Sequence, residues 1–219
     1  MNPGPKTQHA FRRAATHLLA ALAIAIGPAC AGVADETPRG RADTYGRYLT
    51  GQFLIASPKI GDPRFAETVI LMINHDAGGA FGLVVNRVIG QGPLDKFLKG
   101  FGVEGGDRGG EVRLHYGGPV EPGRGFILHS TDFDSPTSMP VDARVAWSTQ
   151  LDALKALSEG KGPRRSLFAL GYAGWGPGQL DGELKRGDWL TAPADEDIVF
   201  GDDQAGKWRK ATQRAGVPL

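Results

Sequence analysis

Three histidines are the side chains of this sequence best suited to acid–base chemistry near neutral pH. His75, His115 and His129 each lie in or at the end of a predicted strand, beside a glycine turn. On neighbouring strands their imidazoles could meet at one rim of a sheet and serve as a general base or as metal ligands. Their spacing matches no metal-ligand signature, and a satisfied structural histidine is the commoner outcome. The sequence therefore predicts no metal site.

The serines near these histidines do not complete a catalytic arrangement. Ser57 and Ser130 are the serines nearest other polar candidates, but neither lies in a Gly-x-Ser-x-Gly turn. His129 directly precedes Ser130, and adjacent side chains on a strand point to opposite faces, so this pair does not make a base and a nucleophile. The sequence thus assigns no catalytic residue.

A glycine-rich segment, residues 174–179, precedes a predicted helix, where backbone N–H groups can bind a phosphate. The segment lacks the Lys-Ser/Thr of a P-loop and the spacing of a dinucleotide fingerprint, and Pro177 removes one donor. We therefore interpret it as a conformationally demanding turn with Trp175 packed on the core, and we predict no cofactor.

The N-terminus has the pattern of an export signal. A basic region (Lys6, Arg12, Arg13) is followed by a mainly apolar run over 14–26, which is too short to span a bilayer. Ala29-Cys30-Ala31 then supplies the small residues that a signal peptidase requires. These features predict a signal sequence over 1–31, with the mature chain starting at Gly32 and exported to the periplasm.

Three other interpretations of this segment stay open. It could be an N-terminal extension that is never cleaved, as in a cytoplasmic protein. The Arg12-Arg13 pair could belong to a twin-arginine signal, although the residues after it complete that pattern poorly. Cys30 could carry a lipid, although Gly27 and Pro28 stand where a lipoprotein signal prefers other residues.

Cleavage would change the charge and the cysteine content. The full chain has 25 basic and 24 acidic residues; residues 1–31 hold three basic and no acidic ones, which leaves 22 against 24, or about −2. We therefore expect no nucleic-acid partner. Cys30 is the only cysteine, so the mature chain has neither a disulfide nor a cysteine nucleophile. We expect no transmembrane helix in it.

Composition and periodicity predict one folded domain behind a flexible leader. Hydrophobic residues make up 41% of the chain and charged residues 22%, as in ordinary globular proteins. Residues 32–47 are polar and lack apolar periodicity, so we expect the leader there and the domain over 48–219. We predict strands at 53–56, 68–74, 82–86, 112–116, 125–129, 145–147, 166–172, 189–191 and 198–200, and helices at 93–99, 149–159, 179–184 and after Asp202.

The order of these elements predicts the fold class. Runs 68–74 and 82–86 should pair as a hairpin with a longer loop, and Thr149 should cap its helix. Because strands and helices intermix without regular βαβ alternation, the pattern favours an α+β, mixed-sheet domain over a doubly wound parallel one.

Several sequence blocks resemble the YqgE/AlgH family. They occur in family order over roughly 49–200 and are more specific together than a lone glycine motif. Glu183 and Trp189 follow the last block. The blocks are 51–56 (GQFLIA), 62–65 (DPRF), His75, 79–87 (GAFGLVVNR), 117–120 (GGPV), 124–129 (RGFILH) and 171–180 (GYAGWGPGQL).

The resemblance implies a single compact domain whose bulged, strongly curved sheet forms a partial barrel with flanking helices. It implies no established reaction, and the family label of transcriptional regulator of exopolysaccharide synthesis rests on one branch. Most members look cytoplasmic. The export signal is a departure from that pattern and weighs against a direct role in transcription here.

The polar residues of these blocks, with one large aromatic, form the predicted functional surface, which suits a protein partner or a small polar ligand. Each also has a structural interpretation: Asn86 and Gln179 can satisfy turn backbone, and Arg87 and Glu183 can form an ion pair. The surface comprises His75, Asn86, Arg87, His129, Trp175, Gln179 and Glu183.

Three classes of function are compatible with the sequence. The leading hypothesis is a non-catalytic binding or accessory protein of the bacterial envelope, because the chain has an export signal and lacks a complete catalytic arrangement. One alternative is a small-molecule hydrolase that uses His75 and His129. The other, a transcriptional regulator, rests on the family label alone.

Overall fold

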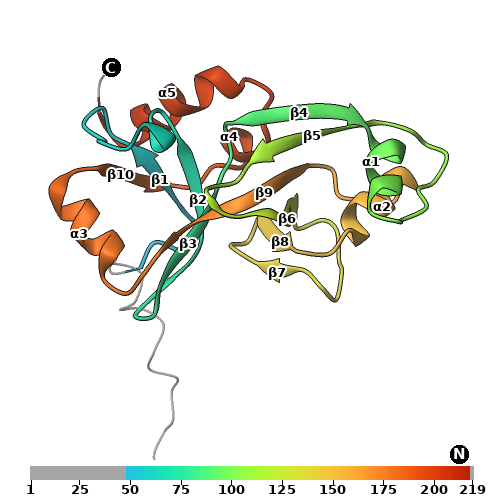
Figure 1. Ribbon diagram of the computed structural model, residues 1–219, viewed down its shortest axis with the longest axis horizontal. Helices are drawn as coiled ribbons and strands as arrows, with labels where there is room; N and C mark the ends of the chain where they lie inside the picture. The colour runs from blue at the N-terminus through green and yellow to red at the C-terminus, as the bar shows by residue number, and fades with distance from the viewer. Residues whose placement is uncertain (1–47, 218–219) are drawn as a thin grey trace, which may run out of the picture. The chain divides into compact units, whose positions relative to one another are not determined.

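The long strand β9 (Ser166–Trp175) organises the sheet and lies at its centre (Figure 1). The computed structural model describes residues 48–217, so the predicted signal sequence 1–31 and leader 32–47 lie outside the described residues. The sheet has 10 strands, and along its main path they follow the order β10-β1-β2-β3-β9-β6-β8-β7, with β5 on β9 and β4 on β5. The other strands are β1 Gln52–Ala56, β2 Val69–Asp76, β3 Gly79–Val84, β4 Val88–Pro93, β5 Glu111–Tyr116, β6 Val120–Ser130, β7 Met139–Pro140, β8 Val145–Ser148 and β10 Trp189–Pro193.

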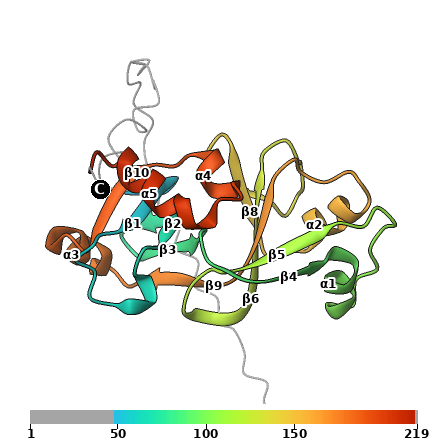
Figure 2. The same ribbon diagram turned by 90° about the horizontal axis from the view of Figure 1, so that it is seen from above.

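β9 joins two parts of the sheet because its two ends have different partners. Its first part pairs antiparallel with β6 and parallel with β5, and its last residues pair antiparallel with β3. The register between β6 and β9 shifts between Val120 and Gly125, and such irregularities bend a strand and increase its twist. The sheet curls into a half barrel, as expected from the resemblance, and the fold is a single α+β domain (Figure 2).

The helices flank this sheet. α5 packs on β1, β2 and β10, α4 packs beside α5, α3 packs on β3 and β10, and α1 and α2 pack together at the end of β4 and β5 (Figure 2). Their bounds are η1 Pro63–Phe65 (a 3₁₀ turn), α1 Leu94–Gly100, α2 Asp152–Ser158, α3 Gln179–Arg186, α4 Glu196–Phe200 and α5 Gln204–Arg214.

The strands β1 and β2 are buried on both faces. Phe53 and Ile55 of β1 pack in one core cluster together with Ala211 of α5. Leu54 packs on the opposite face, in a cluster that includes Leu180 of α3. Since successive strand residues point to opposite faces, burial on both sides requires an uninterrupted apolar run, and this is why the sequence predicted β1 and β2 well.

One predicted strand and one predicted helix cap are wrong. Residues 198–200 were expected as a strand because Ile and Val are β-branched, but they belong to α4. The Asp195 carboxylate accepts hydrogen bonds from the N–H groups of Asp197 and Ile198, and this cap nucleates the helix. Thr149 does not cap α2, which begins at Asp152 without a side-chain cap.

Other boundaries also differ from the prediction. β2 and β3 form the expected hairpin, but the turn between Asp76 and Gly79 has only two residues instead of a longer loop. α5, the helix expected after Asp202, is capped by the side chain of Asp203. The sequence did not predict β4, whose exposed, glycine-containing segment 88–93 lacks an apolar pattern.

The segment 117–118 crosses β9 at very close range. Gly171 has φ +70°, and a Cβ added there would overlap the carbonyl oxygen of Gly118. A Cβ on Gly118 would in turn overlap the backbone of Tyr172. Only glycine combines this left-handed conformation with such an approach.

We expect Gly171→Ala to lower the free energy of unfolding by about 2 to 4 kcal/mol, since it adds left-handed strain to an overlap with backbone. Gly123→Ala is the matched control: Gly123 lies outside the positive-φ region and a Cβ there meets nothing within 4 Å. Urea unfolding of both variants measures the difference, and equal stabilities would contradict the account.

Lys207 anchors α5 to the sheet from within the core. Its side chain is 2% exposed, and Nζ donates hydrogen bonds to the carbonyl oxygens of Val85 (2.7 Å) and Val199 (2.8 Å). Burial, followed by the nearby Arg113 guanidinium, lowers the pKa of Lys207 to about 7. In the folded chain, this amine is therefore about half protonated at pH 7.

Between pH 7 and the ordinary lysine value of 10.5, the unfolded state binds more protons at Lys207 than the folded state does. The free energy of unfolding should therefore rise with pH in this window. Relative to Lys207→Met, the unchanged chain should gain up to about 1.4 kcal/mol per pH unit above pH 7. Lys210→Met, at an exposed position of the same helix, should retain the rise. Parallel pH profiles for the unchanged chain and Lys207→Met would be the contrary result.

Candidate functional site

Three of the predicted surface residues meet where β9 passes into α3. The Glu183 carboxylate accepts hydrogen bonds from Nε1 of Trp175 (2.8 Å), from Nε1 of Trp189 (2.8 Å) and from Nε2 of Gln179 (2.9 Å). The two indole rings are edge to face, with centroids 6.0 Å apart. We name Trp175, Gln179, Glu183 and Trp189 the indole–carboxylate cluster.

Local sequence explains how this cluster forms. Gln179 and Glu183 are four residues apart and so lie on one face of α3. Gly178 has φ +70° just before the helix, and Gln179 Oε1 accepts the N–H of Gly176, which closes the turn. The prediction of a demanding turn with Trp175 packed on the core agrees with this geometry, because Trp175 is buried in the cluster around Leu180.

The carboxylate of Glu183 can accept few further hydrogen bonds. An ionised carboxylate offers about four lone-pair sites, and three hydrogen bonds occupy most of them. The cluster borders a cavity of about 730 Å³ that basic and acidic side chains also line, among them Arg64, Arg186 and Asp188. The cluster therefore acts as a rigid polar wall of this cavity.

A second cavity adjoins the first, because Val120, Gly174 and Trp175 line both. It is an open groove of about 600 Å³ with an aromatic lining. Besides Trp175, four rings from four strands line it, and neighbouring ring centroids among these four are 5.5 to 6.5 Å apart. We name it the aromatic groove; these four rings are Phe81 of β3, Phe126 of β6, Trp147 of β8 and Tyr172 of β9.

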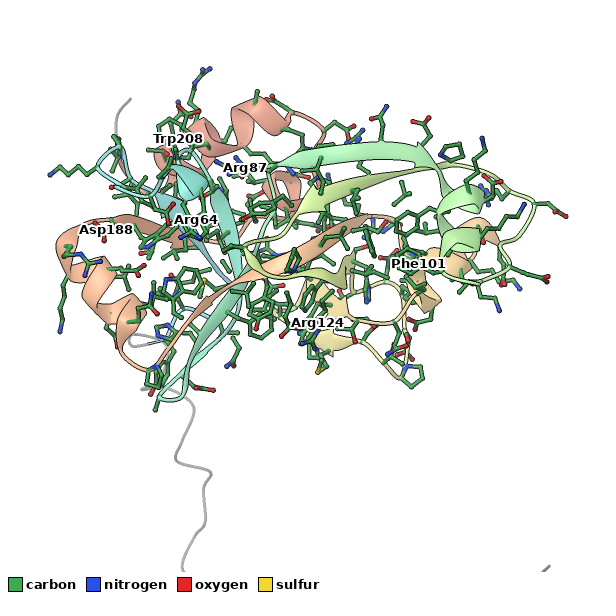
Figure 3. All side chains as sticks on the ribbon, in the orientation of Figure 1. Arg64, Arg87, Phe101, Arg124, Asp188 and Trp208 are labelled. Atoms are coloured by element: carbon green, nitrogen blue, oxygen red, sulfur yellow. The ribbon has the colours of Figure 1, made fainter. Side chains whose placement is uncertain are left out.

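Charged groups border the aromatic groove. The guanidinium of Arg124 lies 5.3 Å from the ring centroid of Phe126, and Figure 3 shows its place on the sheet. Asp76 lines the groove as well, and hydrogen bonds from Asn74 and from backbone N–H groups lower the pKa of its carboxyl. The groove thus combines apolar rings with a cation and an anion.

The side chains of Asn86 and Arg87 have a structural role, since they hydrogen-bond to the backbone of residues 64–69. Asn86 accepts the N–H of Val69 (2.9 Å) and donates to the carbonyl of Glu67 (2.8 Å). Arg87 donates to the carbonyl oxygens of Arg64 (2.5 Å) and Ala66 (2.8 Å), and it lies beside Arg64 in Figure 3. The expected ion pair of Arg87 with Glu183 is therefore not formed.

The histidines do not form one rim. His75 Nδ1 accepts the N–H of Leu49 (3.2 Å), its ring packs on Tyr48, and burial lowers its pKa. His129 is fully buried, and its Nε2 lies 2.7 Å from the Ser138 hydroxyl. Across residues 48–217, no hydrogen bond or ring contact joins His75, His115 or His129 to one another. Within the same range, no group of three or more His, Cys, Asp and Glu could hold a metal ion.

The sequence did not predict the aromatic groove. Phe81 and Phe126 lie in the blocks that resemble the family, yet only polar residues and Trp175 were selected from those blocks. Tyr172 also lies in one of these blocks, whereas Trp147 had no signal beyond its place in a predicted strand. Knowing that four strands bring one ring each to the same place requires the strand pairing, which the sequence pattern did not provide.

The fold and these cavities define a single-domain α+β half barrel with an aromatic groove. The AlgH-like family matches residues 53–219, and the chain belongs to this family. A UPF0301 protein of Methylococcus capsulatus is 46% identical over 184 residues, which cover 84% of this chain and 98% of that one. A UPF0301 protein of Rhodospirillum rubrum is 45% identical over 170 residues, covering 78% and 88%.

Solved structures agree with this assignment. The solution structure of the AlgH protein from Pseudomonas aeruginosa matches with a TM-score of 0.67 and 39% identity, covering 79% of this chain and 92% of that one. A crystal structure of a Corynebacterium diphtheriae protein has a TM-score of 0.63 at 23% identity, covering 78% and 88%, and supports the fold alone. In the described part of this chain, no helix has the length and apolar character needed to cross a membrane.

We expect Glu183→Gln to lower the free energy of unfolding by about 1 to 2 kcal/mol, because the amide has one acceptor atom and cannot satisfy all three donors. Glu104→Gln is the control, since Glu104 is exposed. Denaturant unfolding followed by tryptophan emission tests this directly, because two of the donors are indoles. A variant as stable as the control would show that the cluster contributes nothing to the fold.

Proposed function

We propose that this domain is a non-catalytic binding protein of the bacterial envelope, which holds an extended segment of a partner protein in the aromatic groove. The observation that carries the proposal is the set of four rings from four strands that line one open groove. Three of them, Phe81, Trp147 and Tyr172, are only half-buried. A partner that covers them removes apolar area from water.

The shape of the groove favours a protein segment over a small molecule. Small-molecule sites typically enclose about 70–90% of the ligand surface. The aromatic groove is open, so a small ligand would stay largely in water. Protein interfaces, in contrast, take much of their affinity from aromatic residues near the centre with polar groups at the rim.

The charges at the groove describe the segment it would accept. Arg124 and Asp76 both line the groove together with its aromatic rings. A complementary segment carries an aromatic or aliphatic side chain for the rings, with an acidic residue for Arg124 and a basic residue for Asp76. Such pairs contribute more to orientation and encounter rate than to affinity.

The envelope location rests on the N-terminal sequence. Its basic region, apolar run and Ala29-Cys30-Ala31 motif support export, and the net charge of about −2 left after residue 31 suits a partner other than nucleic acid. The hydrolase alternative has less support, because His75 Nδ1 accepts a backbone N–H. His129 Nε2 does contact the Ser138 hydroxyl, but this histidine is fully buried and its Nδ1 lies on the carbonyl oxygen of Ser130 instead of on a carboxylate. The regulator hypothesis has the family label alone in its favour.

A photo-crosslinking residue in place of Trp147 tests this proposal in living cells. Phe101 is the matched control, because it is an aromatic residue that is 52% exposed and outside the groove (Figure 3). We expect one protein adduct from position 147, none from position 101, and loss of the adduct when Arg124→Glu is added. Equal adducts from both positions, or no protein adduct from position 147, would exclude the groove as the binding site.

A further inference from the structure

A third cavity lies between β5, β9 and the start of α5, and shares no lining residue with the aromatic groove. It measures about 510 Å³. Since a water molecule occupies about 30 Å³ in the liquid, the cavity has room for a small organic molecule. We name it the Lys207 cavity; its polar lining includes Arg113, His115, Arg165, Gln204 and Lys207.

Two buried acceptor atoms on this cavity have no hydrogen-bond partner. The His115 side chain is 3% exposed, and its Nδ1 lies 3.2 Å from the carbonyl oxygen of Phe168. The proton therefore sits on Nδ1, which donates to that carbonyl, and Nε2 is left as an unpaired acceptor. Gln204 donates through Nε2 to the carbonyl of Gly201 (2.9 Å), which leaves its Oε1 unpaired as well.

These two atoms stand out within the described residues. Buried polar groups are nearly always hydrogen-bonded, so each exception asks for a partner. Among residues 48–217, three buried side-chain atoms lack one, and two of the three line the Lys207 cavity. Burial, followed by the nearby Lys207 ammonium, lowers the pKa of His115 to about 4, so its Nε2 stays an acceptor at neutral pH. Each of the two atoms can accept a hydrogen bond from a ligand donor such as a hydroxyl group.

The same cavity also favours negative charge. Four basic side chains line it (Arg113, Arg164, Arg165 and Lys207), against Glu111 and Asp202. Arg113 and Arg165 form ion pairs with Asp202 (2.5 Å) and Asp197 (2.6 Å), which fix their guanidinium groups. The ammonium of Lys207 uses two N–H groups on backbone carbonyls and has no carboxylate partner, so a third N–H is left for a ligand.

We propose that the Lys207 cavity binds a small polyhydroxylated anion, an organic phosphate or carboxylate whose anionic group contacts Lys207 and Arg113, while two of its hydroxyl groups donate to His115 Nε2 and Gln204 Oε1. This arrangement supplies a partner to each unpaired atom and a counter-charge to the buried amine. An anion without a hydroxyl leaves the two acceptors unpaired, and a neutral polyol leaves the amine without a counter-charge. The site is independent of the aromatic groove.

Calorimetric titration with glycerol 3-phosphate and with glycerate, each of which has two hydroxyl groups, tests the proposal and separates a phosphate from a carboxylate ligand. Sulfate and glycerol are the controls: sulfate is an anion that has no hydroxyl group at neutral pH, and glycerol has hydroxyl groups but no charge. We expect at least one of the two hydroxylated anions to bind saturably, at least tenfold tighter than either control. No binding of either hydroxylated anion at 10 mM, or sulfate binding equally well, would overturn the proposal.

Two substitutions at one position assign the contact. His115→Asn keeps a donor near the Nδ1 position for the Phe168 carbonyl but removes the Nε2 acceptor, whereas His115→Gln restores a polar group near the ε position. We expect affinity to fall at least tenfold in His115→Asn and to recover in part in His115→Gln. Gln204→Leu should weaken binding in the same way, and Lys210→Met should leave it unchanged. Undiminished binding in both His115→Asn and Gln204→Leu would refute the site.

Discussion

The rest of the structure depends on the crossing of residues 117–118 over β9 at Gly171. Because Gly118 and Gly171 have no side chains, the two backbone segments approach more closely than any other residue would permit. The crossing lies between the part of β9 that pairs with β5 and β6 and the part that pairs with β3. One strand can therefore belong to both parts of the sheet, and the sheet closes into a half barrel (Figure 1).

The three candidate sites share this strand. Phe168 on β9 lines the Lys207 cavity, Tyr172 lines the aromatic groove, and Trp175 belongs to the indole–carboxylate cluster. A rigid strand that carries a residue of each site holds them at fixed separations, as binding sites on secondary structure elements require. The domain thus presents an open aromatic groove and a separate polar cavity, both built on the same scaffold, and we propose a protein segment for the first and a small anion for the second.

Local patterns predicted much of the fold and part of the site. Apolar runs such as 53–56 were read correctly because burial on both faces leaves an unbroken signal, whereas β4 is exposed and had none. Gln179 and Glu183 were selected together and do meet, since their contact is within one helix turn. The groove and Lys207 were missed because their environments come from strands and helices far apart in the sequence. The β-branched pair Ile198-Val199 misled the prediction because the Asp195 cap decides that segment.

The claim that this is a binding protein of the envelope is tested most directly by the mature N-terminus and its cell fraction. Mass spectrometry of the chain purified from fractionated cells measures both at once. The account predicts a polypeptide that starts at Gly32 and is recovered in the periplasmic fraction. An intact chain that starts at Met1 and stays in the cytosolic fraction would contradict it.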